Sequence, residues 1–469
     1  MGKAVRAVLT GALIAGLVLT GTSAVRADTP RLDWAPCEEN AEVECASLTV
    51  PVDWARPSQG TIEVAVARRA ATGARVGTLV YMPGGPGGSG VDAVLDGGRF
   101  PDEMAARFDI VSFDPRGTNR SHPVECDADL VGEMPNTAPD AGATLADVQA
   151  WTRNIARSCR EHTGALLDHL DNVSVARDIE ALRIALGDRK LNLYGSSYGT
   201  LAGQMYAEQF PHRVRTMLLS GVFDHSLSTA ELVTTEARAA QDSFDQFAEW
   251  CAEDPACALH GQDVHAVFDG LWERAARGEL HLPGNPDRRI DPIALNSQTV
   301  NFFYGPNWAG AADYLKALSE QQSQATTASA EVAQFPIAAF CADHNTRIRS
   351  EREWNRLWRM GNEAAPTVRT HFSWPVMGMC SVWPAQTNNP QHRTDIDGGP
   401  TILLLNSRYD PATPHEWATS VADQIDNSVL LTYEGWGHGV VTANDCTISA
   451  SVDYLVDRVV PAEGASCPV

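Results

Sequence analysis

The sequence predicts an α/β fold with a mostly parallel central sheet and a large helical insertion. From about residue 77 to residue 223, short apolar runs that suit buried strands alternate with amphipathic helices, and the alternation returns after residue 400. Parallel strands follow from this order, because each helical crossover has to return over a face of the sheet. Residues 224–399 lack the alternation. We therefore expect a core formed by residues 28–223 and 400–469, with residues 224–399 as a helical insertion over the carboxyl edge of the sheet.

The first part of the core begins with an N-terminal extension that carries early strands. A helix is indicated where Val175, Ile179, Leu182 and Leu186 recur on one face. A second, alanine-bearing helix follows the turn at residues 195–199 and reaches about Phe210. The predicted strands of this part are Ile62–Ala67, Gly77–Met82, Phe108–Phe113, Leu191–Tyr194 and Val214–Val222, and its first predicted helix is Asn172–Leu186.

The insertion and the C-terminal part differ in pattern. The insertion contains Trp-rich helical segments, an acidic loop between Cys251 and Cys257, and a polar stretch at Ser323–Ser329. After it, strands alternate with helices again. The predicted elements are a strand at Thr401–Leu405, a helix at about Pro414–Ile425, a strand at Ser428–Tyr433 and a helix near Ile448–Val459.

The first 27 residues have the layout of a secretory signal peptide. Lys3 and Arg6 form a short positive region, an apolar segment follows to Leu19, and small residues precede a plausible cleavage point after Ala27 or Ala24. The alternative is an uncleaved membrane anchor, which the short apolar segment disfavours. We expect residues 1–27 to be removed and the mature protein to be secreted, soluble and extracellular, without a membrane partner.

Charge and cysteine content limit the binding partners and the cellular compartment that suit the protein. The chain has 469 residues and a net charge of −23, so nucleic acid and anionic membranes are poor partners. Ten cysteines suit an oxidising compartment. Pairing each cysteine with its neighbour closes five local loops, although sequence alone leaves the connectivity open. No Cys and His spacing fits zinc, so we expect structural disulfides and no metal.

The residues Gly195–Gly199 match the pattern G-x-S-x-G, with Ser197 at its centre. A predicted strand precedes the motif and a helix follows it, which is the context of a nucleophile elbow. The helix would also point its N–H groups at negative charge that develops at the site. The alternative, an incidental serine in a strand–turn–helix, is disfavoured by that context. Ser197 is therefore the predicted nucleophile.

A nucleophilic serine needs a base, and the base needs an acid that orients it. In this fold the acid and then the base follow the serine in the sequence, at the ends of later strands. Asp410 follows the strand at residues 401–405, and His438 follows the strand at residues 428–433, between glycines that leave room for an imidazole. The alternatives are Asp224 for the acid and His415 for the base. We predict Asp410 and His438.

The predicted mechanism also needs two backbone N–H donors for the oxyanion of the intermediate. One should come from Tyr198, the residue after the serine, and the other from Gly84 or Gly85 in the glycine-rich loop after an early strand. Residues 85–90 of that loop also fit the dinucleotide pattern G-x-G-x-x-G. The segment after it is too short and too glycine-rich for a phosphate-binding helix, so we expect no cofactor.

Taken together, the motifs resemble the secreted tripeptidyl aminopeptidases, α/β-hydrolases that are related to prolyl aminopeptidases. The matching segments are Pro83–Gly87, Phe113–Gly117, Tyr194–Thr200, Asp410–Pro414 and Gly437–His438. The resemblance implies the α/β-hydrolase fold, a triad of Ser197, Asp410 and His438, and release of short peptides from free amino termini. Two departures affect the shape of the neighbouring pocket: Met82-Pro83, where relatives often have Asn-Pro or a histidine, and Asn119, where a glycine is usual.

We therefore expect a secreted, monomeric serine exopeptidase that releases tripeptides from peptide or protein N-termini. A substrate ammonium would need a carboxylate on the insertion, and Asp343 is our choice because a disulfide at Cys341 would fix its loop. The alternative is a secreted carboxylesterase or lipase with the same triad and an apolar acyl pocket. A non-catalytic binding protein of this fold would usually lack a triad residue, and none is missing here.

Overall fold

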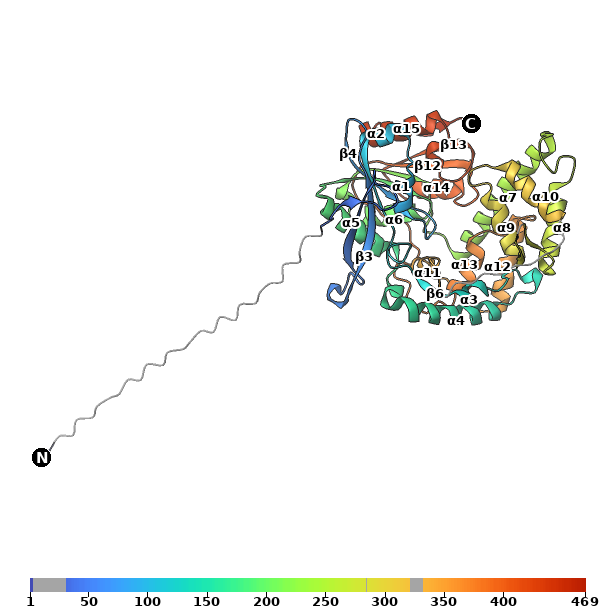
Figure 1. Ribbon diagram of the computed structural model, residues 1–469, viewed down its shortest axis with the longest axis horizontal. Helices are drawn as coiled ribbons and strands as arrows, with labels where there is room; N and C mark the ends of the chain where they lie inside the picture. The colour runs from blue at the N-terminus through green and yellow to red at the C-terminus, as the bar shows by residue number, and fades with distance from the viewer. Residues whose placement is uncertain (3–30, 284, 321–331) are drawn as a thin grey trace.

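The computed structural model describes residues 1–2, 31–283, 285–320 and 332–469, and Figure 1 shows how its elements are arranged. Apart from residues 1–2, the predicted signal peptide lies outside the described residues, and so does the polar stretch 323–329. Among the described residues, no helix is both long and apolar enough to cross a membrane.

A sheet of ten strands forms the centre of the molecule. Its order is β1-β2-β3-β5-β4-β7-β8-β12-β13-β14. Pairing is antiparallel along the first four strands of this order, β1 to β5, and parallel along the rest, β5-β4-β7-β8-β12-β13-β14. The predicted mostly parallel sheet is therefore confirmed. The bounds are β1 (Ala35–Pro36), β2 (Glu44–Pro51), β3 (Thr61–Arg69), β4 (Gly77–Met82), β5 (Phe108–Phe113), β7 (Leu191–Ser196), β8 (Val214–Ser220), β12 (Ile402–Tyr409), β13 (Ser428–Trp436) and β14 (Ser466–Cys467).

Helices cover both faces of the sheet, because its central strands are apolar on both sides. Successive residues of β4 illustrate this: Leu79 and Tyr81 belong to one core cluster, and Val80 and Met82 belong to the other. Helices α1, α2 and α15 pack into the first cluster, and α5, α6 and α14 pack into the second. Their bounds are α1 (Gly90–Asp96), α2 (Asp102–Arg107), α5 (Asn172–Leu186), α6 (Gly199–Gln209), α14 (His415–Ala422) and α15 (Asp445–Asp457).

Between β8 and β12 the described residues form seven helices, and Figure 1 shows α7 to α10, α12 and α13 grouped on one side of the sheet. This is the stretch that the sequence predicts as a helical insertion, and the boundaries at residues 224 and 399 remain predictions. The bounds are α7 (Thr229–Glu253), α8 (Val264–Ala276), α9 (Pro292–Asn301), α10 (Trp308–Ser319), α11 (Ala338–Asp343), α12 (Glu351–Ala364) and α13 (Ser373–Cys380).

The helical group also includes a segment that precedes β7, which the sequence does not predict. Helix α4 (Leu145–Thr163) packs against α12 and α13, and the Glu351 carboxylate accepts a hydrogen bond from the Leu145 amide. The short helix α3 (Ala128–Gly132) follows strand β6 (Glu125–Asp127). Two small antiparallel pairs complete the fold and are formed by β6 with β11 (Val332–Gln334) and by β9 (His281–Leu282) with β10 (Asn285–Arg289).

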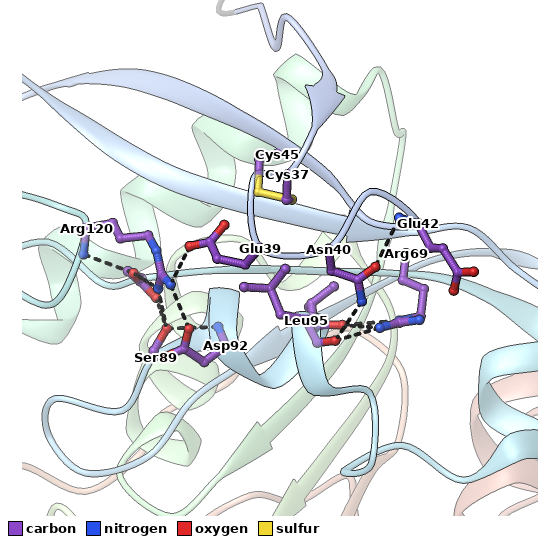
Figure 2. Close-up of a disulfide and its surroundings, with 12 residues drawn as sticks. Cys37, Glu39, Asn40, Glu42, Cys45, Arg69, Ser89, Asp92, Leu95 and Arg120 are labelled. Atoms are coloured by element: carbon purple, nitrogen blue, oxygen red, sulfur yellow. Dashed lines mark hydrogen bonds and ion pairs between the residues drawn. A yellow bond between two sulfur atoms is a disulfide. The ribbon is translucent and has the colours of Figure 1, made fainter.

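Five disulfides join neighbouring cysteines, which confirms the predicted pairing and suits an oxidising compartment. One of them closes the loop between β1 and β2 (Figure 2). From that loop, the Asn40 side chain donates to the carbonyl of Leu95 in α1, so the N-terminal segment helps to hold this helix. The pairs are Cys37–Cys45, Cys126–Cys159, Cys251–Cys257, Cys341–Cys380 and Cys446–Cys467.

Candidate active site

Ser197 lies in a sharp turn between β7 and α6. Its φ angle is +56°, in the left-handed region that residues with a side chain rarely adopt. The turn is held because the Ser197 amide donates to the carbonyl of Ser220, at 2.9 Å. Glycine is required at 199, since a Cβ there would lie 2.2 Å from the carbonyl oxygen of Met82. A strained serine that the surrounding backbone holds in place is the geometry of a nucleophile elbow.

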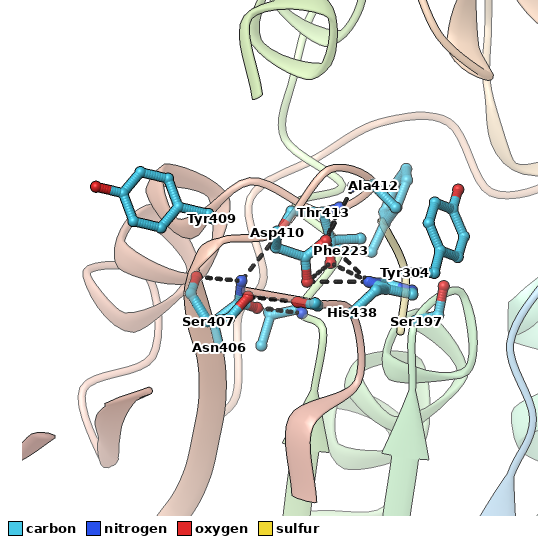
Figure 3. Close-up of polar contacts among 12 residues, drawn as sticks. Ser197, Phe223, Tyr304, Asn406, Ser407, Tyr409, Asp410, Ala412, Thr413 and His438 are labelled. Carbon is cyan, nitrogen blue, oxygen red and sulfur yellow. Dashed lines mark hydrogen bonds and ion pairs between the residues drawn. The ribbon is translucent and has the colours of Figure 1, made fainter. Parts of the chain in front are cut away.

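Asp410 and His438 form a hydrogen-bonded pair, as Figure 3 shows. Both carboxylate oxygens of Asp410 lie 2.9 Å from Nδ1 of His438. The carboxylate is buried, and it also accepts hydrogen bonds from the amides of Ala412 and Thr413, both at 2.9 Å. The Thr413 hydroxyl lies 3.1 Å from Asp410 Oδ2 and 3.2 Å from His438 Nδ1. These contacts fix the orientation of the imidazole.

The other imidazole nitrogen, Nε2, has no hydrogen-bond partner among the described residues and is buried. Figure 3 shows the ring between Asp410 and Ser197, with Tyr304 beside it. The Tyr304 carbonyl accepts from the His438 amide at 2.7 Å, and the two rings lie 5.1 Å apart. A Cβ at Gly221 would come within 2.9 Å of the His438 ring, so a glycine there leaves room for it. The predicted serine, histidine and aspartate are thus brought together.

Ser197 and His438 line a cavity of about 530 Å³, which we call the central cavity. The glycine-rich loop after β4 forms part of its wall, and the insertion supplies Tyr304, Phe340 and Phe372. A larger hollow of about 660 Å³ lies at the opposite edge of the sheet, where β7, β8 and β12 begin, and contains none of the predicted site residues. The central cavity is therefore the candidate substrate site.

The predicted oxyanion-hole residues lie at the cavity too. Tyr198 immediately follows the serine and begins the turn into α6, and Gly84 and Gly85 line the cavity wall. Gly84 is so close to the serine that a Cβ on it would lie 2.6 Å from Cβ of Ser197. Any side chain at this position would therefore displace the serine or the loop. Tyr198 and Gly84 or Gly85 stay the predicted sources of the two backbone donors.

Asp343 does not lie in the cavity wall, and its surroundings do not suit the predicted binding of an ammonium. Its side chain is 0% exposed. Oδ1 accepts from the Asn172 amide and from Asn389, and Oδ2 accepts from the Asn172 side chain and from the Tyr198 hydroxyl at 2.6 Å. Burial raises the pKa of Asp343 to about 7. Because its oxygens are engaged by protein donors, Asp343 fixes the Tyr198 ring rather than facing a substrate.

The two alternatives that the sequence left open for acid and base are also engaged elsewhere. Asp224 accepts from Ser226 and Gln424, and His415 bonds through Nε2 to Thr432 at 2.8 Å. Burial lowers the pKa of His415. Neither residue contacts His438 or Asp410 through these bonds.

The dinucleotide-like pattern at residues 85–90 leads into the short helix α1, whose N-terminus is already occupied. The buried Asp114 carboxylate accepts from the Val91 amide at 3.1 Å and from the Ser89 hydroxyl at 2.6 Å. A phosphate bound in the dinucleotide manner would need this same position.

Asn119, one of the departures from the family pattern, lies beside the glycine-rich loop. Its φ angle is +44°, which explains why glycine suits the position and why asparagine is tolerated. Its side chain donates to the carbonyl of Gly87 at 2.9 Å. The asparagine therefore ties this loop to the turn after β5, a contact that glycine could not make.

Glu236 lines the candidate site, and the sequence analysis did not single it out. It lies on α7, lines the central cavity and is only 3% exposed. Its sole donor among the described residues is the Ser373 amide, at 2.8 Å, and no described lysine or arginine forms an ion pair with it. Burial raises the pKa of Glu236 to about 7. The available signal was its position between Leu232 and Ala240 on the apolar face of an amphipathic helix, where an unpaired carboxylate is rare.

The chain is similar to known proteins over most of its length. A family model described as "TAP-like protein" matches residues 365–467, which include Asp410 and His438. The serine protease Hip1 of Mycobacterium tuberculosis is 32% identical, over 93% of this chain and 91% of its own. A tripeptidyl aminopeptidase of Streptomyces coelicolor is 30% identical, over 95% of this chain and 87% of its own. Carboxylesterase B of Mycobacterium tuberculosis is 29% identical, over 93% and 90%.

The similarity to each of these three relatives extends over nearly the whole of both chains, and the serine turn joins a strand of the parallel sheet to a helix, as in a nucleophile elbow. The chain therefore belongs to the TAP-like family of α/β-hydrolases and is a serine hydrolase.

Proposed function

We propose that the protein is a secreted serine exopeptidase that releases short peptides, above all tripeptides, from the free N-termini of peptides and proteins. The observation that carries this proposal is the buried, unpaired carboxylate of Glu236 in the wall of the cavity that also holds Ser197 and His438. An ionised carboxylate without a protein cation is unfavourable in such a place, and a substrate ammonium would supply the missing charge. The name of the Streptomyces relative supports the same activity.

In the proposed mechanism, Ser197 Oγ attacks the scissile carbonyl while His438 Nε2 takes its proton. Asp410 holds the imidazole through Nδ1 and stabilises the imidazolium that forms. The backbone N–H groups of Tyr198 and of Gly84 or Gly85 hold the oxyanion of the intermediate. His438 then gives the proton to the leaving amine. Water that His438 activates next hydrolyses the acyl-enzyme and releases the peptide.

Glu236 defines the end of the substrate in this proposal. Its carboxylate would bind the α-ammonium of the first residue, and the bound charge would favour the ionised form of the carboxylate. An acetylated N-terminus has no charge to offer and would leave the carboxylate unpaired. Secretion is supported by the five disulfides and by the predicted signal peptide, and we expect the protein to act as a monomer.

The test compares tripeptidyl p-nitroanilides that have a free or an acetylated N-terminus with simple p-nitrophenyl acyl esters. The wild-type protein should cleave the free tripeptidyl substrate far faster than the acetylated one, and Ser197→Ala should abolish both activities. Equal cleavage of the free and acetylated substrates would refute the exopeptidase. Turnover of esters alone would favour a carboxylesterase, the activity named for one relative. Full activity of Ser197→Ala would refute the mechanism itself.

A further inference from the structure

The wall of the central cavity contains a second charged side chain that the proposed function does not use. Arg99 lines the cavity with Tyr81 and Ser89, on the exposed turn that follows α1. No carboxylate among the described residues lies within 4.0 Å of its guanidinium nitrogens. Of the residues that line this cavity in the described structure, Arg99 carries the one fixed positive charge and Glu236 the one carboxylate.

The two charged side chains come to the cavity wall from different parts of the fold. The guanidinium carbon of Arg99 lies 5.8 Å from the centre of the Tyr81 ring, on strand β4. Burial raises the pKa of Tyr81, and the Arg99 and Ser196 side chains act against that rise. Glu236 comes from the insertion, together with Tyr304, whose ring packs on His438. The cavity thus has a cationic side on the core and an anionic side on the insertion.

The backbone that carries Arg99 is held in place. Arg69 donates to the carbonyls of Val94 and Leu95 at the end of α1, and Asn40 donates to the same Leu95 carbonyl (Figure 2). The Gly97 amide closes the helix on the carbonyl of Ala93. The guanidinium is therefore presented from a fixed turn, which lowers the entropic cost of binding an anion.

We propose that Arg99 binds a carboxylate on the residue that leaves after cleavage. The substrate class is then short peptides, above all tetrapeptides, whose leaving residue carries a free α-carboxylate close to the scissile bond. This proposal rests on the proposed function. A short peptide with a free ammonium and a free carboxylate carries one charge that complements Glu236 and one that complements Arg99, and a cavity of about 530 Å³ is in the size range of small-ligand sites. Guanidinium and carboxylate form strong, paired hydrogen bonds.

The test measures release of the fourth residue from three tetrapeptides with the sequence Ala-Ala-Ala-X. The first ends in phenylalanine as a free acid, the second is its C-terminal amide, and the third is an amide with aspartate in place of phenylalanine. The proteins are the wild type, Arg99→Ala, Arg99→Lys and the control Arg352→Ala, which changes an exposed arginine of α12. Thermal unfolding checks that each variant is folded.

The wild type and Arg352→Ala should cleave the free acid about tenfold faster, in kcat/KM, than the phenylalanine amide. This ratio should fall to about one in Arg99→Ala and be partly kept in Arg99→Lys. High salt should reduce it, because the arginine is exposed. Fast cleavage of the aspartate amide would show that a side-chain carboxylate serves equally well.

A wild-type ratio of about one, or a ratio that survives Arg99→Ala, would overturn the carboxylate site and leave the exopeptidase standing. If neither form of the phenylalanine peptide is cleaved while acyl esters are, both the exopeptidase and the carboxylate site are refuted.

Discussion

Replacing Glu236 by glutamine should make the protein more stable and less selective at the same time. The folded state raises the pKa of this carboxyl from 4.5 to about 7, because burial disfavours its charged form. Below pH 4.5 the carboxyl is protonated in the folded and in the unfolded chain, so it has no effect on stability. Between pH 4.5 and about 7 the unfolded chain ionises while the folded chain keeps its proton, so the free energy of unfolding falls as the pH rises, and the loss is complete above 7. At 1.36 kcal/mol per pKa unit, this destabilisation reaches about 3 kcal/mol.

Glutamine has nearly the same shape and can still accept the hydrogen bond from the Ser373 amide. The free energy of unfolding of Glu236→Gln should therefore exceed that of the wild type by about 3 kcal/mol at pH 8 and match it at pH 4. Denaturant unfolding of both proteins across this range measures the difference. The control Glu253→Gln, at the exposed end of the same helix, should show no such trend. A constant difference across pH would refute the buried, ionising carboxylate.

The same substitution should affect substrates according to their N-terminus. A hydrogen bond between charged groups contributes about 1.5–3 kcal/mol, so kcat/KM for a free tripeptidyl substrate should fall about 10- to 100-fold. Cleavage of an acetylated substrate should change little. In the wild type, KM for the free substrate should rise as the pH falls through 7, where Glu236 becomes protonated. Equal losses for both substrates in Glu236→Gln would contradict ammonium binding.

Three further substitutions test other parts of the structure. Gly84→Ala should lower kcat/KM at least 100-fold in a folded protein, because the added Cβ would lie 2.6 Å from Cβ of Ser197. The control Gly270→Ala, whose added Cβ would have no atom within 4 Å, should keep the kcat/KM of the wild type. Arg116→Met should reduce the free energy of unfolding by about 3–5 kcal/mol, because it leaves the Asp178 carboxylate buried and unpaired. A loss below 1 kcal/mol in denaturant unfolding would argue against the buried ion pair of Arg116 and Asp178. Removing the Cys341–Cys380 disulfide, which spans 39 residues of the insertion, should lower the free energy of unfolding by about 4 kcal/mol in the same denaturant assay. Removing the Cys251–Cys257 disulfide, which spans six residues, should lower it by about 2 kcal/mol. The reverse order of the two losses would contradict the loop-entropy argument.

Sequence patterns predicted the sheet well where strands are buried on both faces. The apolar runs at residues 77–82 and 108–113 have the bounds of β4 and β5, and the helix predicted at 172–186 is α5. Such strands and helices are easy to recognise in a sequence, because burial requires apolar residues in short runs or at helical spacing. Strands β7, β12 and β13 were predicted too short, since they continue into the polar residues of the turns that follow them, whereas the strand predicted to reach Val222 ends at Ser220 as β8.

The placement of Ser197, Asp410 and His438 could be predicted because they follow strands in a fixed order, so that local sequence places each of them at the same edge of the sheet. Glu236 and Asp343 show the limit of this reasoning. Both are single acids among many, and whether their oxygens face a cavity or protein donors depends on helices far apart in the sequence. Asp343 accepts hydrogen bonds from Asn172 and Asn389, and the sequence around Asp343 does not indicate either of these distant partners. The packing of α4 against α13 was missed for the same reason.

The central claim is that Ser197, with His438 as its general base, attacks a substrate whose free ammonium is held in the same cavity. Labelling with a tripeptidyl diphenyl phosphonate tests it most directly, because such a reagent reacts with an activated serine. The free-amine reagent should attach once per chain, at Ser197 in peptide mapping by mass spectrometry, and at least tenfold faster than its N-acetylated form. His438→Ala should prevent the labelling. A label on any other residue, or equal rates for the free and acetylated reagents, would contradict the account.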